Sequence, residues 1–296
     1  MEHLRTYRDA VAVITGGASG IGAALAQALV NQGASVVIAD RDGRSAAELA
    51  TRLGARADSA ELDVRDGAGF ATTIASVWAR HGRIDYLFNN AGIASVGEVR
   101  QHSLDDWNEV VDVNLRGVIH GVASVYPRMI AQGFGHIVNT SSLSGLCALP
   151  GGAPYAATKH AIVGLSRSLR IEAKAHRVRV SVLCPGPVRT RLLVGGGKFG
   201  RSVQGACAEG SCAEDSEAFW EQLRPMAPDS LAKRVLRRIA RDHAIIVEPT
   251  RWRVAWLLDR ISPRLSDWYV GKHWARRHVS AAPARADRDE RAGGGR

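Results

Sequence analysis

The stretch AVAVITGGASGIGAALAQALV, residues 10–30, decides the fold. An apolar, β-branched run predicts a strand, Ala10–Thr15, and the residues from Gly20 onward have a helical pattern. Between them the chain must turn sharply on glycine, at Gly16, Gly20 and Gly22. Glycines there leave the backbone open to a phosphate, and the start of a helix offers N–H groups to it. An ordinary glycine-rich turn is the alternative, but the place between a strand and a helix favours the phosphate end of a dinucleotide site.

The rest of the chain repeats this alternation of short apolar runs and longer helical segments, which is typical of βαβ units around a parallel sheet. Strands are predicted at Ala10–Thr15, Ala34–Ala39, Ala57–Leu62, Ile84–Asn89, His136–Thr140, Arg179–Cys184 and Ala244–Val247. Helices are predicted at Gly20–Asn31, Arg44–Arg52, Gly67–Arg80, Leu104–Ala131, Pro154–Ala175 and Ser230–Arg241. The fold class is therefore α/β: a Rossmann-like, doubly wound parallel sheet of about seven strands with helices on both faces, in a single domain.

Composition divides the chain into three parts. Residues 1–250 are expected to form the dinucleotide-binding and catalytic domain, with 194–225, rich in Gly, Ser and Ala, as a loop region facing the substrate. Residues 251–279 form an amphipathic extension rich in Trp and Arg, and 280–296 are expected to be disordered.

Charge and cysteine usage narrow the function classes. The net charge is +10, and residues 220–296 carry most of it, with 17 Lys and Arg against 9 Asp and Glu. Because this excess lies away from the motifs, we expect a solvated basic surface and no nucleic-acid partner. Four scattered cysteines, no signal-peptide pattern and no run of roughly 20 apolar residues favour a cytoplasmic protein with reduced thiols and no metal site.

Asp40 follows the second predicted strand, about 20 residues after the glycine turn. An acid at that place accepts hydrogen bonds from the ribose hydroxyls of a bound dinucleotide and repels a 2′-phosphate, so NAD is favoured over NADP. Arg41 follows directly and would offset part of that repulsion. A cap or turn residue is the alternative role for Asp40.

Tyr155 and Lys159 lie four residues apart on a predicted helix and therefore share a face. A phenol has a pKa near ~10 and is a poor base at neutral pH, but a nearby ammonium stabilises the phenolate. Such a pair suits general acid–base chemistry, although by itself it would more often be a surface pair. Ser142 comes thirteen residues before Tyr155, just after the strand HIVNT, with Ser141 and Ser144 as alternatives.

The chain contains a series of short motifs and single residues: TGGASGIG (Thr15–Gly22), Asp63–Val64, NNAG (Asn89–Gly92), Asn114, Ser142, YAATK (Tyr155–Lys159) and PGPVRT (Pro185–Thr190). In this order and at these intervals they resemble the short-chain dehydrogenase/reductase family over about residues 8–190. The resemblance implies an oxidoreductase that interconverts an alcohol and a ketone or aldehyde.

The resemblance also assigns roles. It implies Tyr155 as general acid and base, Lys159 lowering the pKa of Tyr155 and holding the nicotinamide ribose, Ser142 bonding the substrate oxygen, and Asn114 supporting a proton relay through water. It implies that a second set holds the cofactor: Thr15, Gly16, Ser19, Gly20, Ile21, Gly22, Asp40, Arg41, Asp63, Val64, Asn90, Ala91, Gly92, Tyr155, Lys159, Pro185, Gly186, Val188 and Thr190.

The C-terminal segment departs from the family pattern. Many members end soon after the seventh strand with an Asp-Gly-Gly turn, whereas this chain continues as AIIVEPTRWRVAWLLDRISPRL. The departure leaves a homodimer or a homotetramer open. For Arg251–Trp274 three interpretations remain: a helix covering core or subunit surface, a lid over an apolar substrate pocket, and a peripheral membrane contact. Similar extensions in members acting on lipid-like or steroid-like compounds favour a hydrophobic substrate.

Two other functions compete with the dehydrogenase. A cofactor-binding regulator or scaffold would keep the fold without turnover, but it has no chemical need for Ser142, Tyr155 and Lys159. A nucleic-acid binder would show steeply salt-dependent DNA binding that is lost when residues 220–296 are deleted.

Overall fold

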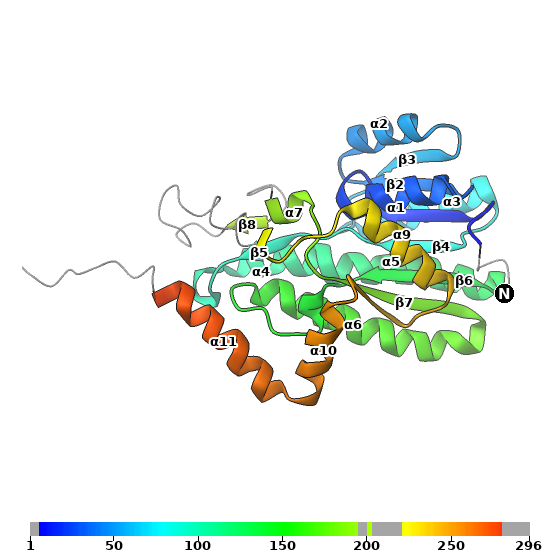
Figure 1. Ribbon diagram of the computed structural model, residues 1–296. Helices are drawn as coiled ribbons and strands as arrows, with labels where there is room; N and C mark the ends of the chain where they lie inside the picture. Colours follow the sequence, from blue (N-terminus) through cyan, green and yellow to red (C-terminus); the bar gives the residue numbers. More distant parts are fainter. Residues whose placement is uncertain (1–5, 195–199, 203–220, 280–296) are drawn as a thin grey trace, which may run out of the picture.

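Seven parallel strands form the central sheet of the computed structural model, which describes residues 6–194, 200–202 and 221–279 (Figure 1). Their order across the sheet is β3-β2-β1-β4-β6-β7-β9, and every neighbouring pair is parallel. The strands are β1 (Val11–Thr15), β2 (Ser35–Asp40), β3 (Ala57–Glu61), β4 (Tyr86–Asn89), β6 (Gly135–Thr140), β7 (Val178–Pro185) and β9 (Ile245–Glu248). Each lies within two residues of a predicted strand, so the Rossmann-like, doubly wound fold is confirmed.

Helices cover both faces of the sheet (Figure 1). One face carries α1, α2 and α9, and the other carries α3, α5 and α6. The helices are α1 (Gly20–Val30), α2 (Gly43–Leu53), α3 (Gly67–His81), α4 (Leu104–Val111), α5 (Gly117–Gln132), α6 (Ala153–Ala173), α7 (Arg191–Val194), α9 (Pro228–Ala240), α10 (Trp252–Ile261) and α11 (Pro263–Val279). Short 3-10 helices are η2 (Val99–Gln101), η4 (Leu143–Gly145) and η5 (Lys174–His176).

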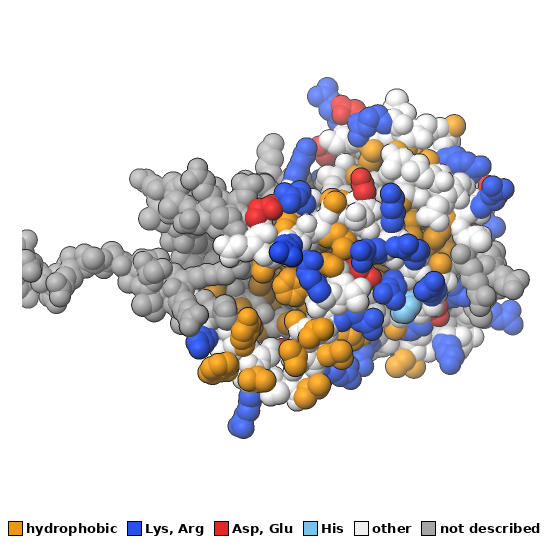
Figure 2. Space-filling model, in the orientation of Figure 1, with side chains coloured by type: hydrophobic (Ala, Val, Ile, Leu, Met, Phe, Trp, Pro, Cys, Tyr) orange, Lys and Arg blue, Asp and Glu red, His pale blue; other side chains and the backbone are white. Residues whose placement is uncertain are grey.

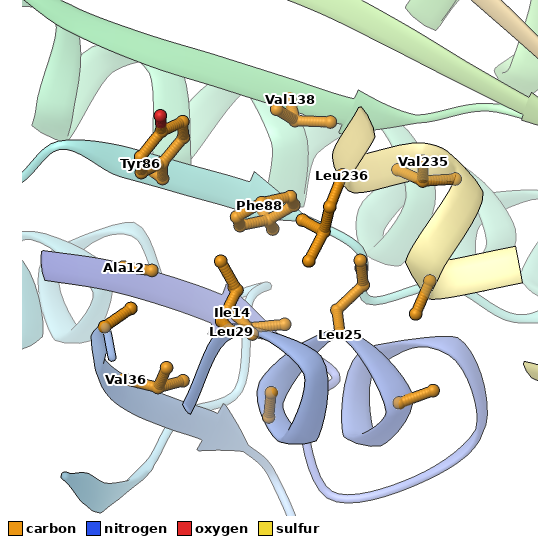
Figure 3. Close-up of a cluster of buried hydrophobic side chains, with 14 of the residues drawn as sticks. Ala12, Ile14, Leu25, Leu29, Val36, Tyr86, Phe88, Val138, Val235 and Leu236 are labelled. Carbon is orange, nitrogen blue, oxygen red and sulfur yellow. The ribbon is translucent and has the colours of Figure 1, made fainter. Parts of the chain in front are cut away.

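Alternation along the strands divides the core into two layers. Ile14 of β1 points to the layer under α1 and α9, while its neighbour Val13 points to the layer under α3 and α5, because successive side chains in a strand face opposite ways. In the first layer Leu25 of α1, Phe88 of β4 and Leu236 of α9 meet over the sheet (Figure 3). The central strands are apolar on both faces for this reason.

Two expectations about secondary structure are wrong in detail. The single long helix expected over Leu104–Ala131 is two helices, α4 and α5, joined by a π-helical turn, η3 (Asp112–Arg116). A π-turn adds one residue within an otherwise continuous helix, and so small a shift of the apolar period is not recognised in a single sequence. The second difference is a small parallel sheet of β5 (Ala94–Val96) and β8 (Gly200–Ser202), whose three-residue strands are too short to show a period.

Some predictions concern residues that the structure does not describe. The loop region expected at 194–225 falls mostly on 195–199 and 203–220, which lie outside the described residues, and so does the whole tail expected at 280–296. In the described parts of the chain no helix is long and apolar enough to cross a membrane.

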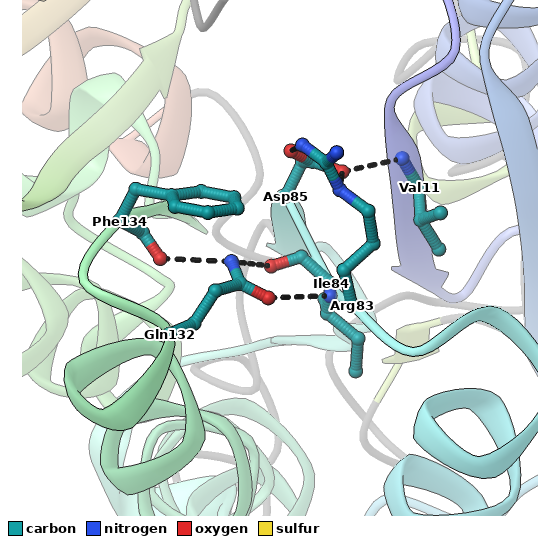
Figure 4. Close-up of polar contacts among 6 residues, drawn as sticks. All are labelled: Val11, Arg83, Ile84, Asp85, Gln132 and Phe134. Atoms are coloured by element: carbon teal, nitrogen blue, oxygen red, sulfur yellow. Dashed lines mark hydrogen bonds and ion pairs between the residues drawn. The ribbon is translucent and has the colours of Figure 1, made fainter.

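A cluster of polar contacts holds together the amino ends of β1 and β4 and the end of α5 (Figure 4). Asp85 is buried, and its carboxylate accepts hydrogen bonds from the backbone N–H of Val11 at 2.8 Å and from Nε of Arg83 at 2.9 Å. Gln132 donates to the carbonyl oxygens of Ile84 and Phe134 and accepts from the N–H of Ile84. These bonds satisfy backbone groups that the sheet leaves open, and they lie at the edge of the sheet opposite the carboxyl ends of the strands.

Candidate active site

The sheet order places a crevice between β1 and β4. From β1 the chain builds outward through β2 to β3, and from β4 it builds the other way to β9. Loops that leave neighbouring strands in opposite directions open a gap at the carboxyl ends, where open α/β sheets bind ligands. The glycine turn follows β1, Asn90 follows β4, Ser142 follows β6, and Pro185 ends β7. The predicted site residues therefore gather at one edge of the sheet.

Gly16 and Gly22 of the glycine turn are packed too closely against the backbone to carry a side chain. Gly16 has φ +60°, and a Cβ there would lie 2.8 Å from Cα of Ala91. A Cβ on Gly22 would lie 2.2 Å from the carbonyl oxygen of Gly16. Ser19, the N-cap of α1, makes no capping hydrogen bond with its side chain. Helix starts leave N–H groups without intrahelical partners, so this end of α1 suits an anion.

A brace between β1 and β4 holds the glycine turn in place. The Thr15 hydroxyl accepts hydrogen bonds from the N–H groups of Asn90 at 3.0 Å and Ala91 at 3.1 Å. The Asn90 side-chain amide donates to the carbonyl oxygens of Thr15 and Gly16, both at 3.2 Å. These bonds fix the shape of the glycine turn, residues 15–22, which we call the phosphate cradle. They are made by three residues that the resemblance assigned to the cofactor: Thr15, Asn90 and Ala91.

Asp40 lies at the end of β2 beside the glycine turn. Its carboxylate accepts hydrogen bonds from the N–H groups of Ala18 and Asp42, both at 3.1 Å. A carboxylate has about four acceptor positions, so two bonds leave others for ligand hydroxyls. A Cβ on Gly17 would lie 2.9 Å from both the Ile14 carbonyl oxygen and Cγ2 of Ile38, which excludes a basic side chain at that position of the turn.

Asp63 and Val64, which the resemblance assigned to the cofactor, follow β3 and make contacts within the protein. The Arg65 side chain forms an ion pair with the Asp63 carboxylate, and its Nε donates hydrogen bonds to the two oxygens at 3.0 and 2.9 Å. This pairing lowers the pKa of Asp63. The Val64 side chain is buried, and a Cβ on Gly117 would lie 2.8 Å from its Cγ2. The Val64 side chain therefore packs against the start of α5. Arg41, also assigned to the cofactor, is exposed and close enough to Asp63 to contribute to lowering its pKa.

Tyr155, Lys159 and Ser142 come together where β6 and α6 meet. Tyr155 is in the first turn of α6, and Nζ of Lys159 lies 5.4 Å from the centre of its ring. The buried Lys159 ammonium donates a hydrogen bond to the carbonyl oxygen of Thr140 at 2.9 Å. Ser142 comes two residues after the end of β6, and its hydroxyl lies close enough to the Tyr155 hydroxyl to lower the pKa of that phenol.

Burial controls the protonation of this group in the absence of a ligand. It raises the pKa of Tyr155, and the hydrogen bond with Ser142 offsets part of that rise. Burial also lowers the pKa of Lys159 to about 8. The sequence led us to expect a lowered pKa for Tyr155. Desolvation is the largest cause of both shifts, because burial takes water away from the charged form of each group.

The structure distinguishes the three serines after β6. The Ser141 hydroxyl is buried and donates to the carbonyl oxygen of Lys159 at 2.7 Å, so it serves the backbone of α6. Ser142 is partly exposed and lies beside Tyr155. Ser144 bonds back to Ser142 through its N–H at 3.1 Å. Of the three, Ser142 has the geometry to meet a substrate oxygen.

Asn114 lies in the π-helical turn η3 and is completely buried. Its amide accepts from the N–H of Ile93 at 2.8 Å and donates to the Ile93 carbonyl oxygen at 2.9 Å and to the Thr158 hydroxyl at 3.2 Å. A Cβ on Gly92 would lie 3.2 Å from Oδ1 of Asn114 and 3.3 Å from Nζ of Lys159. Oδ1 of Asn114 and Nζ of Lys159 therefore both lie close to Gly92, where a side chain would crowd them. π-turns often occur at functional sites.

The segment after β7 closes the other side of the crevice. A Cβ on Gly20 would lie 3.2 Å from Cγ2 of Thr190, so the loop after β7 reaches the glycine turn. Val188 is buried and forms a backbone bridge with Met226. A Cβ on Gly186 would lie 2.5 Å from Cδ1 of Trp252, the first residue of α10. The C-terminal extension therefore contacts the loop after β7 through Trp252, a residue pair that the sequence analysis did not specify.

Other supporting residues also escaped the sequence analysis. Thr140 contributes a backbone oxygen to Lys159, and Thr158 contributes a hydroxyl to Asn114. Thr158 lies within the YAATK motif but was assigned no role there, and Thr140 is the last residue of β6, so only the three-dimensional packing shows what these two residues do. In the part of the chain that the structure describes, no group of three or more His, Cys, Asp or Glu side chains could hold a metal ion.

Fold and site together define a dinucleotide-binding α/β protein, and comparison with known proteins gives the family. The family model for short chain dehydrogenases matches residues 10–196. SadH from Mycobacterium tuberculosis is 35% identical over 265 residues, which cover 87% of this chain and 92% of that protein. The oxidoreductase UcpA from Escherichia coli is 41% identical over 183 residues, 60% of this chain and 69% of UcpA.

Solved structures agree. A short-chain dehydrogenase/reductase from Burkholderia phymatum, in complex with NAD, has a TM-score of 0.75 and 29% identity, covering 88% of this chain and 95% of that one. A 3-ketoacyl-(acyl-carrier-protein) reductase from Brucella melitensis, complexed with NADH, has a TM-score of 0.72 and 25% identity, covering 82% and 98%. This chain belongs to the short-chain dehydrogenase/reductase family of oxidoreductases.

Proposed function

We propose that this protein is an NAD-dependent dehydrogenase or reductase that interconverts an alcohol and its ketone or aldehyde, with Tyr155 as general acid and base. One observation carries the proposal: Ser142, Tyr155 and Lys159 share one end of the sheet with the glycine turn after β1. A protein that only binds a dinucleotide needs the turn but has no use for a serine and a buried lysine around a tyrosine hydroxyl.

The phosphate cradle and the loop after β7 together fit a dinucleotide. The glycine turn lacks side chains where a pyrophosphate would approach, and the start of α1 has N–H groups for it. Pro185, Gly186, Val188 and Thr190 stand across the crevice and are the groups we assign to the nicotinamide end. The bound cofactor would supply or accept the hydride.

Asp40 favours NAD over NADP. Its carboxylate is held at the glycine turn by two backbone N–H groups, and a 2′-phosphate would bring a second negative charge against it. Gly17 has no room for the basic side chain that would attract that phosphate. Arg41 is the nearest cation along the chain, and it is exposed, so water and salt weaken its effect.

The proton chemistry belongs to the three side chains at the top of β6 and α6. In the oxidative direction Tyr155 Oη takes the proton of the substrate hydroxyl, and in reduction it returns a proton to the carbonyl oxygen. The Ser142 hydroxyl donates a hydrogen bond to that substrate oxygen as negative charge develops on it. The ammonium of Lys159 stabilises the Tyr155 phenolate, which counteracts the effect of burial on that pKa.

Asn114 acts as a positioning residue. It fixes Ile93 after β4 and Thr158 on α6 through three hydrogen bonds, and so sets the space around Gly92 and Lys159. The proton relay that the family resemblance implies would begin at the Lys159 ammonium, next to this asparagine.

We propose a hydrophobic substrate. Leu143 and Leu146 of η4 follow Ser142 and pack in one apolar cluster with Trp252 and Trp256 of the extension. Leu149 lies against Gly152, just before Tyr155. Apolar side chains thus surround the polar reacting group, the usual composition of a small-molecule site. A cytoplasmic location and a homodimer or homotetramer, as the resemblance implies, complete the proposal.

A panel of hydrophobic alcohols and ketones tests the function. Each compound is mixed with the purified protein and NAD or NADH, and the absorbance of NADH is followed. Turnover of several apolar compounds, with NAD preferred, is the expected result. Tight NADH binding with no turnover of any compound would favour the alternative, a cofactor-binding regulator of the same fold.

A further inference from the structure

The C-terminal helices α10 and α11 present large apolar side chains to solvent. Seven such side chains, which we call the C-terminal apolar face, are between 49% and 79% exposed. They are Val254, Leu257, Leu258, Ile261, Leu265, Trp268 and Tyr269. Monomeric proteins rarely leave so many neighbouring apolar side chains in water, and such patches mark surfaces for partners or membranes.

Helix α10 carries two rows of apolar side chains, one packed against the domain and one exposed as part of the C-terminal apolar face. Trp252 and Trp256 lie one turn apart and pack inward against the apolar cluster of α6 and β7. Val254 and Leu258 lie one turn apart on the opposite side and point outward. Residues three and four apart share a helix face, so the exposed positions 254, 257, 258 and 261 form one continuous stripe.

The stripe continues on α11, which packs against α10. Leu265, Trp268 and Tyr269 have the same spacing of three and four and are exposed. Trp274, further along α11, faces inward, since a Cβ on Gly151 would lie 2.7 Å from its ring. Both helices are thus held on one side by contacts to the domain, and the hydrophobic side chains gather over them on the molecular surface (Figure 2).

Basic side chains border this face. Residues 251–274 contain five Lys and Arg against two Asp. Nζ of Lys272 lies 5.1 Å from the centre of the Trp268 ring. Arg253 and Arg260 are exposed on α10, beside its apolar stripe. One of the two acids, Asp259, accepts a hydrogen bond from the Ser266 hydroxyl between the helices. Aromatic and aliphatic side chains with a cationic border match an anionic phospholipid surface, which offers an apolar layer beneath negative headgroups.

A second copy of the chain fits less well. A two-fold contact would place the same face against itself and bring the arginine borders of both copies together. Like charges across an interface oppose association. We therefore propose that the C-terminal apolar face docks the protein on anionic membranes, with α10 and α11 lying in the plane of the interface.

The docked orientation would bring the membrane close to the site. Trp274 of α11 contacts Gly151, four residues before Tyr155, and Trp252 of α10 contacts Gly186. Both inner faces of the docking helices thus border the loops that we assign to the substrate and the nicotinamide. Docking itself depends only on the surface, so it stands whether or not the proposed reaction is correct.

Vesicle sedimentation with the full chain tests the proposal. The wild type is compared with Ile261→Ser/Trp268→Ser, which removes two apolar side chains from the face and leaves every charged residue in place. Ile171→Ser on α6 is the control, because Ile171 is another strongly exposed aliphatic residue outside the face. Vesicles contain phosphatidylcholine alone or with roughly one third phosphatidylglycerol, and NADH binding confirms that each variant is folded.

We expect the wild type and the Ile171 variant to sediment with the anionic vesicles, and the double variant to bind at least about tenfold more weakly. Equal binding by the double variant would show that the basic side chains bind the vesicles by charge alone, without the apolar face, and would overturn the proposal. Absence of binding by the wild type would overturn it too. So would a dimer of the wild type, seen by light scattering, that the double variant loses while neither protein binds vesicles.

Discussion

The ammonium of Lys159 lies 5.4 Å from the centre of the Tyr155 ring, one helical turn further along α6, and donates a hydrogen bond to the Thr140 carbonyl oxygen. A buried lysine whose ammonium donates to a neutral carbonyl costs stability, because its charge has lost water and is not paired with an anion. The pKa of Lys159, lowered to about 8, reflects that cost. The proposed chemistry gives the reason for keeping the charge there.

Replacing Lys159 by methionine should therefore stabilise the unliganded protein and reduce its activity. Lowering a pKa from 10.5 to about 8 corresponds to roughly 3 kcal/mol, and loss of the bond to Thr140 offsets part of it. We expect Lys159→Met to raise the free energy of unfolding at neutral pH by roughly 1–2 kcal/mol. Activity should fall by about a hundredfold or more.

The pH dependence gives a second readout for the same variant. Between pH 8 and 10.5 the unfolded chain binds more protons at Lys159 than the folded protein, so wild-type stability gains a contribution as pH rises through this window. Lys159→Met should lack that contribution. Lys233→Met, at an exposed lysine of α9, is the control and should resemble the wild type. A destabilised Lys159→Met protein with the wild-type pH profile would contradict the argument.

Ser142 and Ser141 should separate activity from stability. Ser142→Ala removes the group that we assign to the substrate oxygen, and hydride transfer should drop by about a hundredfold with little change in stability. Ser141→Ala removes the buried bond to the Lys159 carbonyl oxygen and should cost about 1 kcal/mol of stability. Steady-state kinetics and urea unfolding measure the two effects. The reverse pattern would move the role of Ser142 to its neighbour.

Asp40→Ser should change the cofactor preference. Without the carboxylate at the glycine turn, a 2′-phosphate meets no negative charge, and the ratio of kcat/KM for NADP to that for NAD should rise by at least about tenfold. Asp42→Ser is the control, because Asp42 caps α2 and lies two residues away on the same loop. An unchanged ratio in Asp40→Ser, or an equal change in Asp42→Ser, would contradict the assignment of Asp40.

His136 should limit stability in acid. It is completely buried between β4 and β7, its Nε2 bonds the Ser181 hydroxyl at 2.8 Å, and burial lowers its pKa to about 3. Below pH 6.5 the unfolded chain binds this proton while the folded protein does not, so stability falls as pH falls from 6.5 towards 3. The contribution of His136 to this loss should be about 2 kcal/mol at pH 5.

His136→Gln removes that titration and keeps a donor for Ser181. Urea unfolding between pH 7 and 4 should therefore show a flatter acid limb for this variant. His160→Gln, at an exposed histidine of α6, is the control and should follow the wild type. Identical acid limbs for wild type and His136→Gln would show that carboxylates, rather than His136, determine the loss.

The sequence predicts the parts of this molecule that local chemistry specifies. The buried strands of the main sheet follow from apolar runs, because strands buried on both faces must be apolar, whereas the edge strand β3 has the mixed sequence ADSAE. The glycine turn and the spacing of Tyr155 and Lys159 follow from backbone and helix geometry. The π-turn at Asn114 and the strands β5 and β8 escape prediction, because one inserted residue or three paired ones leave no period.

Long-range packing accounts for the rest of what the sequence misses. The bond from Lys159 to Thr140 and the contact of Trp252 with Gly186 join segments that are distant in the chain. The amphipathic character of residues 251–274 was visible, but the sequence does not show which apolar side chains face the domain. The structure shows Trp252 and Trp256 inside and Leu257 and Trp268 outside.

Hydride transfer by Tyr155→Phe tests the central claim most directly. Phenylalanine keeps the ring in place and removes the one hydroxyl that we assign to proton transfer. Tyr126→Phe, at a partly buried tyrosine of α5, is the matched control. With the best alcohol or ketone of the panel, turnover by Tyr155→Phe should fall by at least about a thousandfold while NADH binding is unchanged and Tyr126→Phe stays fully active. Full turnover by Tyr155→Phe would contradict the proposed mechanism.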